Sequence, residues 1–309
     1  MQTTDVKSLI ESAPSIRPEY LIMDDKNWRY LVRNVLRGKN TMLIGPAGCG
    51  KTLAVSTVAN AMERPFYYFN LGATQDPRGS LIGSMHFDAT TGTYFSKATF
   101  IRAIQTENAV ILLDELSRAH PEAWNILMTV LDETQRYVRL DESPNGEVVK
   151  VANGVCFIAT ANFGMEYTST REVDYAILDR FQLIKMKLLD KDNQSKLLRL
   201  ACPNIDDVSV NVLTSVYQQV NDEIDSNSGK LTRRISTRTT IAAAELICDG
   251  FSVRDALEVS VFPYFSEDGG LESEQTYVRQ IVQKYLPEEH LKNDNMFDEG
   301  DTTTDSSPF

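Results

Sequence analysis

The sequence predicts an α/β fold with a parallel, doubly wound sheet, followed by a small all-α domain. Three observations lead to this prediction. Apolar strand-like segments alternate with helical segments up to residue 190, only helical periodicity follows, and a glycine-rich loop joins the first strand to its helix. The strand-like segments are short, continuous apolar runs, which are typical of parallel strands covered on both faces.

Length and composition limit the classes of protein to consider. The 309 residues have room for about two domains, and 42% of them are hydrophobic, enough for real cores. The net charge of -12 argues against broad nonspecific DNA binding. No apolar run approaches the roughly 18 residues of a membrane span, and the N-terminus lacks a signal pattern, so a cytoplasmic protein is expected. Four scattered cysteines and three histidines suggest neither a zinc site nor a disulfide framework.

The first half of the chain predicts the elements of the sheet in order. Residues 1–25 are expected to be an irregular lead-in because Pro14 and Pro18 break helices, and Asp25 is expected to cap the helix that follows. The α/β domain is predicted to span residues 26–190. Its expected elements are strand 41–45, helix 51–62, strand 66–71, helix 100–105, strand 110–114, helix 121–134, strand 155–162 and strand 183–189.

Two hairpins are expected to interrupt this alternation, near residues 84–95 and 136–151. The first alternates around a T-T-G turn and the second around a P-N-G turn, and both are flanked by residues of strand character. Taken alone, both are equally consistent with ordinary surface hairpins.

Residues 191–286 are predicted to form a helical domain, because apolar residues recur there at spacings of three and four. Residues 287–309 gain acids, Thr and Ser and are expected to be a disordered tail. The tail ends in Pro308 and Phe309, similar to the protein-docking tips of bacterial single-stranded-DNA-binding proteins; a solubilising tail is the other interpretation. The expected helices are 193–202, 208–225, 236–249, 253–263 and 273–286.

The glycine-rich loop has the sequence GPAGCGKT and matches G-x-x-x-x-G-K-[ST] between a buried strand and a helix. Backbone N–H groups of such a loop wrap a polyphosphate, Lys51 reaches the outer phosphates, and the Thr52 hydroxyl ligates Mg²⁺. A glycine turn that matches by chance is the alternative. The predicted nucleotide-binding residues are Gly45, Pro46, Ala47, Gly48, Cys49, Gly50, Lys51, Thr52 and Leu53.

A second site supports the first. The run VILLDE places Asp114 and Glu115 at the end of a predicted buried strand. Asp114 is expected to hold Mg²⁺ with Thr52, and Glu115 to orient and deprotonate an attacking water. The alternative is a core strand followed by solvated acids. The two motifs together predict an ATP-dependent, Mg²⁺-dependent nucleoside triphosphatase.

With these parts in order, the chain resembles the AAA+ ATPases, in the clade with a helix-two insert and a pre-sensor-1 hairpin. It is most similar to the MoxR-type group, with its CobS-like and CbbQ/NorQ-type relatives. The resemblance covers roughly residues 18–286 and implies an AAA+ core followed by a helical lid. The motifs that carry it are DELSRAHPEAWNILMTVLDE at 114–133, ATANFG at 159–164, AILDRF at 176–181 and STRTTIAAAEL at 236–246.

The resemblance assigns roles to three further residues. Asn162 matches sensor 1, which would hold the lytic water or the γ-phosphate together with Glu115. Arg180 matches the arginine finger, which acts on the site of the next subunit. Arg238 matches sensor 2, although Arg233 and Arg234 compete for that role. A finger that acts in trans implies a homo-oligomeric ring, and relatives of this kind are hexamers.

Four other residues have weaker assignments. Arg118 is expected to be a surface or interface charge. Asp76 lies in a segment similar to the D-L-I-G segment of the group, but Ser80 stands where an acid is expected. Tyr94 and Phe95 are candidate pore-facing aromatics of the first hairpin, unless they pack on their own domain.

Three functions compete at this point. The first is an ATPase that remodels or activates a partner protein, often one with a von Willebrand A domain, as the resemblance implies. The second is the ATPase subunit of a CobS-like metal chelatase, whose metal chemistry would lie elsewhere because this chain shows no ligand cluster. The third is a nucleic-acid-processing accessory ATPase, supported by a possible basic pore lining of Arg136, Arg139 and Lys150.

Overall fold

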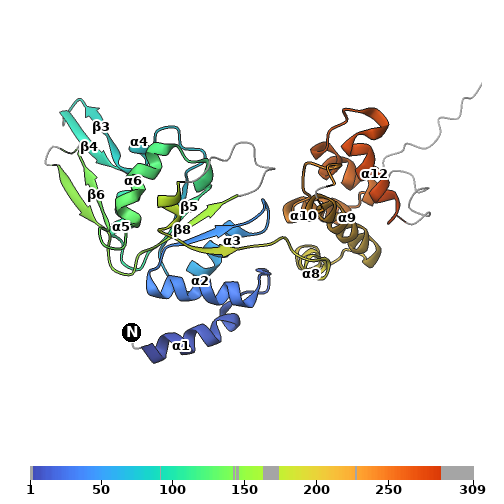
Figure 1. Cartoon of the computed structure of the whole chain (residues 1–309), viewed down its shortest axis with the longest axis horizontal. Coiled ribbons are helices and arrows are strands. Elements are labelled where there is room, and N and C mark those ends of the chain that lie inside the picture. The colour runs from blue at the N-terminus through green and yellow to red at the C-terminus, as the bar shows by residue number, and fades with distance from the viewer. Residues whose placement is uncertain are drawn as a thin grey trace, which may run out of the picture. The chain divides into compact units, whose positions relative to one another are not determined.

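The computed structural model describes residues 3–90, 92–141, 143, 146–162, 174–226 and 228–286. The chain divides into two compact units, Met1–Leu188 and Leu189–Phe309 (Figure 1). The predicted tail 287–309, with Pro308 and Phe309, lies outside the described residues.

The first unit contains a five-stranded sheet in the order β2-β5-β8-β1-β9, and every pairing in it is parallel. The carboxyl ends of all five strands therefore lie at one edge, the carboxyl edge, and their amino ends at the opposite, amino edge. This arrangement confirms the predicted fold class. The strands are β1 (Thr41–Ile44), β2 (Phe66–Asn70), β5 (Val110–Asp114), β8 (Cys156–Ala161) and β9 (Gln182–Lys185).

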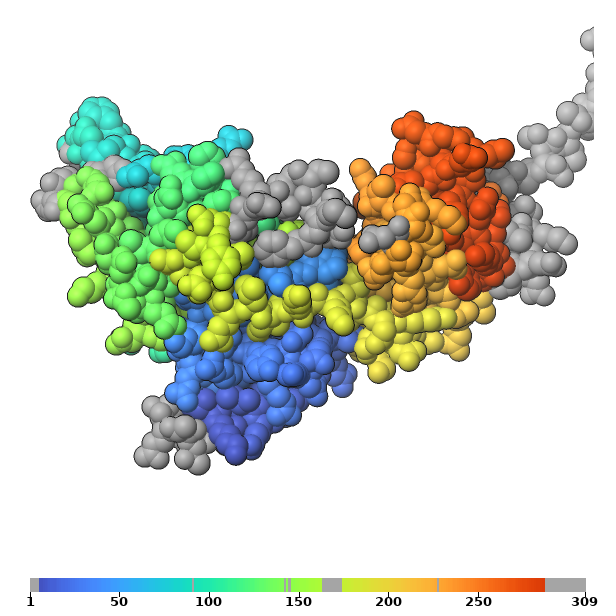
Figure 2. Space-filling view, in the orientation of Figure 1, coloured from blue at the N-terminus to red at the C-terminus, as the bar shows by residue number. Residues whose placement is uncertain are grey.

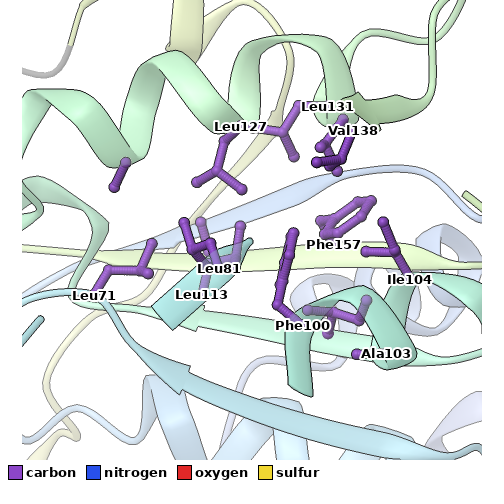
Figure 3. Packing of buried hydrophobic residues seen from close by; sticks show 14 of the residues in the cluster. Leu71, Leu81, Phe100, Ala103, Ile104, Leu113, Leu127, Leu131, Val138 and Phe157 are labelled. Atoms are coloured by element: carbon purple, nitrogen blue, oxygen red, sulfur yellow. The ribbon is translucent and has the colours of Figure 1, made fainter. Parts of the chain in front are cut away.

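Helices cover both faces of the sheet and create two cores. Successive residues of β5 point to opposite faces, so Val110 and Leu112 join one core and Ile111 and Leu113 the other. One core contains residues of α2 (Asp25–Arg37) and α3 (Lys51–Ala61). The other contains residues of α5 (Thr99–Gln105) and α6 (Pro121–Leu131), with Phe100 and Phe157 at its centre (Figure 3).

The N-terminal segment differs from the prediction. Residues expected to be irregular form α1 (Thr3–Ser12) and a 3₁₀ helix, η1 (Ala13–Ile16). Pro14 is tolerated because it lies in the first turn of η1, where no N–H donor is needed. The cap of α2 is Asp24, whose carboxylate accepts from two backbone N–H groups, and not Asp25.

Two antiparallel hairpins lie where the sequence predicts them. The first pairs β3 (Gly83–Asp88) with β4 (Gly92–Lys97), follows α4 (Pro77–Leu81) and stands out from the surface of its unit, in cyan (Figure 2). The second pairs β6 (Tyr137–Leu140) with β7 (Glu147–Lys150). Lys97 and Glu147 form an ion pair of 2.7 Å between them.

The second unit is helical in its described residues, apart from turns and loops. Gln194 is fully buried and bonds the hydroxyls of Thr237 and Thr240, which fixes α8 against α10. No helix within the described ranges is long and apolar enough to cross a membrane. The helices are α8 (Lys191–Ala201), α9 (Asp207–Asp225), α10 (Thr237–Cys248), α11 (Val253–Ser260) and α12 (Glu274–Gln283), with 3₁₀ turns η3 (Phe262–Tyr264) and η4 (Gly270–Glu272).

Candidate active site

The glycine-rich loop leaves β1 at the carboxyl edge and enters α3. Gly48 and Gly50 have φ of 75° and 86°, in the left-handed region that favours glycine. A Cβ on Gly45 would collide with the Met186 carbonyl oxygen, so only glycine fits beside the end of β9. The loop therefore curls at the N-terminus of α3, where backbone N–H groups and the helix dipole favour a phosphate.

Lys51 is the buried cation of this loop. Its Nζ donates to the carbonyl oxygens of Gly45 at 2.8 Å and Pro46 at 2.7 Å. Burial lowers the pKa of Lys51, while burial raises the pKa of the neighbouring Cys49 thiol. The ammonium thus occupies the mouth of the loop, held by two carbonyls that phosphate oxygens can replace.

Three hydroxyls converge on the Asp114 carboxylate at the end of β5. Thr52 Oγ1 lies 3.1 Å from Oδ1 and 3.2 Å from Oδ2, Tyr68 OH donates to Oδ2 at 3.1 Å, and Thr160 Oγ1 donates to Oδ1. Partial burial and then the charge of Asp114 raise the pKa of Tyr68. A carboxylate beside a threonine hydroxyl is the oxygen donor set that Mg²⁺ prefers, so these residues fit the predicted metal.

Glu115 follows in a strained conformation, with φ of 57°. Its backbone N–H donates to Thr160 Oγ1 at 3.0 Å, and its Oε2 lies 3.6 Å from Arg118 Nη1. A Cβ on Gly72 would collide with the same Oε2, so Gly72 leaves room for this carboxylate. Arg118, expected as a plain surface charge, is an ion-pair partner of Glu115 and lies in η2 (Leu116–Arg118).

Asn162 directly follows β8, which lies between β5 and β1. Its Oδ1 atom is buried and has no hydrogen-bond partner among the described residues. Buried polar atoms are almost always paired, with protein, water or a ligand. This orphan oxygen at the carboxyl edge suits a residue that binds a ligand or an attacking water.

Arg180 lies away from this cluster. It precedes Gln182, which pairs with Thr41 at the start of β1, whereas the phosphate loop follows the end of β1. Its guanidinium bonds its own unit: Nε to Met128 O at 3.2 Å, Nη1 to Ala176 O at 2.6 Å and Nη2 to Asp132 Oδ2 at 3.2 Å. Arg180 thus lies at the amino edge of the sheet, opposite the carboxyl edge where the phosphate loop of the same chain lies.

The three arginines considered for sensor 2 all belong to the second unit. Arg233 Nη1 donates to Tyr264 O at 3.3 Å, and Arg234 Nη2 pairs with Asp225 Oδ1 at 2.6 Å. Arg238 is exposed in the first turn of α10 and forms no ion pair with the described residues. Arg233 and Arg234 bond groups of their own unit, and Arg238 remains the match to sensor 2 that the resemblance implies.

Several weaker assignments are settled by contacts. Asp76 caps α4 through a bond from Gly79 N at 3.0 Å, which gives it a structural role. Phe95 packs against the core of the first unit, so its prediction as a pore-facing aromatic is wrong. Tyr94 is 46% exposed and Phe87 78%, which makes Phe87 the more exposed aromatic of the hairpin.

The structure also corrects the interpretation of Arg136. It was a candidate for a basic pore lining, but its Nη2 donates to Val155 O at 2.7 Å and its guanidinium lies 5.3 Å from the centre of the Phe157 ring. Burial lowers its pKa. Arg136 is half-buried and bonded within its own unit, and the case for a nucleic-acid function loses one of its three residues.

The phosphate loop, the hydroxyl after its lysine and the paired acids at the end of a neighbouring strand define a P-loop nucleoside triphosphatase. Family models agree: residues 40–181 match the AAA domain of the dynein-related subfamily, and residues 221–284 match the CbbQ/NirQ/NorQ C-terminal domain.

The chain is also similar to individual proteins. The chain is 32% identical to "Putative chaperone BssE" of Thauera aromatica over 72% of this chain and 74% of that protein. It is 31% identical to an uncharacterized protein of Staphylococcus saprophyticus over 56% of this chain and 64% of that one. A mutant of Thermotoga maritima RuvB shares the fold, with a TM-score of 0.52, 11% identity and coverage of 87% of this chain and 72% of that one.

The chain therefore belongs to the AAA+ family, in the group related to CbbQ, NirQ and NorQ. This agrees with the MoxR-type resemblance seen in the sequence. Membership implies nucleotide binding and ATP hydrolysis.

Proposed function

We propose that this chain is a Mg²⁺-dependent ATPase that works as a homo-oligomeric ring, a hexamer as in similar AAA+ proteins, and uses hydrolysis to remodel or activate a partner protein. The observation that carries the proposal is the separation of Arg180 from the phosphate loop of its own chain. The length of strand β1 separates them, which supports the supply of this guanidinium by a second copy.

The residues of the carboxyl edge perform the binding and the proton transfer. The loop from Gly45 to Leu53 cradles the phosphates, and Lys51 exchanges its two carbonyl partners for phosphate oxygens. Thr52 and Asp114 would hold Mg²⁺, which neutralises charge on the phosphates when bound. Glu115 takes the proton of the attacking water, and Asn162 orients that water with its unpaired oxygen.

Residues from other parts of the chain complete the proposed site. Arg180 of a neighbouring copy neutralises the charge that develops in the transition state. Arg238 is proposed as the sensor 2 residue, as the resemblance implies.

The partner is proposed to be a protein, such as one with a von Willebrand A domain. Support comes from the name of the Thauera relative and from the CbbQ/NirQ/NorQ C-terminal match. The exposed side chains of Phe87 and Tyr94 offer an apolar contact surface on the first hairpin.

Glu115→Gln tests the proposed chemistry. We expect turnover to fall by about 100-fold or more, because the amide cannot accept the proton, while ATP binding and ring assembly persist. Phosphate release, fluorescent-nucleotide binding and light scattering measure the three properties. Glu107→Gln, the same change at an exposed loop position, is the control. Wild-type turnover in Glu115→Gln would refute the assignment.

The same phosphate-release assay separates the proposed partner from the alternative. We expect a candidate von Willebrand A-domain protein to stimulate hydrolysis by the full chain. Stimulation by single-stranded DNA alone would favour the nucleic-acid function instead.

A further inference from the structure

One side chain that the motifs do not single out touches both acids of the active site. Thr160 lies on β8, is 2% exposed, and donates its hydroxyl hydrogen to Asp114 Oδ1. The same oxygen accepts the Glu115 backbone N–H at 3.0 Å. The Thr160 hydroxyl thus donates one bond to Asp114, the last residue of β5, and accepts one from Glu115, the residue that follows.

This bond falls where the backbone is strained. Glu115 has a left-handed φ of 57°, which a residue with a long side chain rarely adopts without support. The turn after β5 sets where the Glu115 carboxylate points. A bond to the N–H of that residue holds the turn, and the second bond ties the turn to the metal-binding carboxylate.

We propose that Thr160 is a positioning residue that fixes the Glu115 turn and the Asp114 carboxylate as one unit. The inference rests on the proposed function, because it assumes that Glu115 and Asp114 act on nucleotide and metal. The hydroxyl does the positioning, and the methyl group only packs. Loss of the hydroxyl leaves the partly buried Glu115 N–H without this partner and lets the turn relax.

Matched variants separate these two roles. Thr160→Val removes the hydroxyl at nearly constant volume, and Thr160→Ser keeps it. Thr41→Val is the control, because Thr41 is also fully buried and its hydroxyl also accepts one bond and donates another, at the amino edge of the adjacent strand β1. Tyr68→Phe removes a different hydroxyl from Asp114 without touching Glu115.

The first readout is amide hydrogen exchange of the full chain without nucleotide. We expect Thr160→Val to speed exchange at Glu115 by about tenfold, the effect of losing one buried hydrogen bond, and Thr41→Val, Tyr68→Phe and Thr160→Ser to leave that amide protected. Unchanged protection in Thr160→Val would overturn the proposal. If Thr160→Val does not fold, Thr160→Ala gives the same comparison.

The second readout is kinetic. We expect Thr160→Val to lower kcat by about tenfold and to raise the half-saturating Mg²⁺ concentration, with ATP affinity changed less than about threefold, and Thr160→Ser to restore both. A Thr160→Ser variant as slow as Thr160→Val would overturn the proposal, since the methyl packing would then be responsible. If Glu115→Gln is inactive but Thr160→Val turns over normally, this inference alone fails; active Glu115→Gln means that the proposed function fails.

Discussion

The two edges of the central sheet carry different parts of the proposed active site. At the carboxyl edge, Lys51 follows the end of β1, and Asp114 and Glu115 lie at the end of β5, with β8 paired between the two strands. At the amino edge, Arg180 is isolated from them and bonded to the backbone and a carboxylate of its own unit.

The comparison indicates which groups each edge contains. The carboxyl edge contains the phosphate loop, the oxygen donors proposed for a cation, the proposed base Glu115 and the unpaired amide oxygen of Asn162. The arginine that pairs with Glu115 there is Arg118, which lies three residues further along the same turn. The amino edge has the Arg180 guanidinium, whose three nitrogens bond Met128, Ala176 and Asp132. On the proposed function, Arg180 acts on the carboxyl edge of a second copy, and we therefore expect activity to depend on the contact between copies.

The largest effect is expected from the loss of the arginine at the amino edge. Arg180→Ala should lower turnover by about 1000-fold, because an arginine that neutralises transition-state charge has an effect of that size. ATP binding should persist, since the phosphate loop is untouched. Phosphate release and nucleotide titration measure both. Arg139→Ala, which removes an exposed arginine of the second hairpin, is the control. Loss of nucleotide binding in Arg180→Ala would instead mean that Arg180 stabilises the conformation of the phosphate loop.

A smaller effect is expected away from both edges, on the first hairpin. Phe95→Ala should lower the stability of the first unit by about 2 kcal/mol because it removes a core contact. Phe87→Ala should leave the melting temperature unchanged, since Phe87 is 78% exposed, and should remove stimulation by a partner protein. Thermal unfolding and partner-stimulated ATPase activity separate the two. Equal destabilisation by both would mean that Phe87 packs in solution.

The order of the elements was predictable because it depends on local patterns. The β5 run VILLDE alternates between two cores, and GPAGCGKT requires glycine at left-handed positions, so both are visible in the sequence. The prolines predict an irregular N-terminus, but α1 ends before Pro14, and Pro14 lies in the first turn of η1, which tolerates it.

Contacts between distant residues were not predictable from single positions. Phe95 and Phe87 both lie in the same hairpin, and only the packing against the core of the first unit shows that Phe95 is partly buried and Phe87 exposed. The sequence offers Arg136 as a possible pore-lining charge, whereas its guanidinium lies against the Phe157 ring. Thr160 gave one usable signal: a polar residue inside the fully buried strand Cys156–Ala161 needs a partner, and Asp114 and Glu115 provide it.

Mixing two inactive variants tests most directly whether the site is shared between copies. Lys51→Ala lacks a working phosphate loop but keeps Arg180, and Arg180→Ala has the opposite defect. A mixed ring contains interfaces that pair an intact loop with an intact arginine, so the mixture should regain ATPase activity that neither variant has alone. A mixture that stays inactive across all ratios, while mixed rings form, would contradict catalysis in trans.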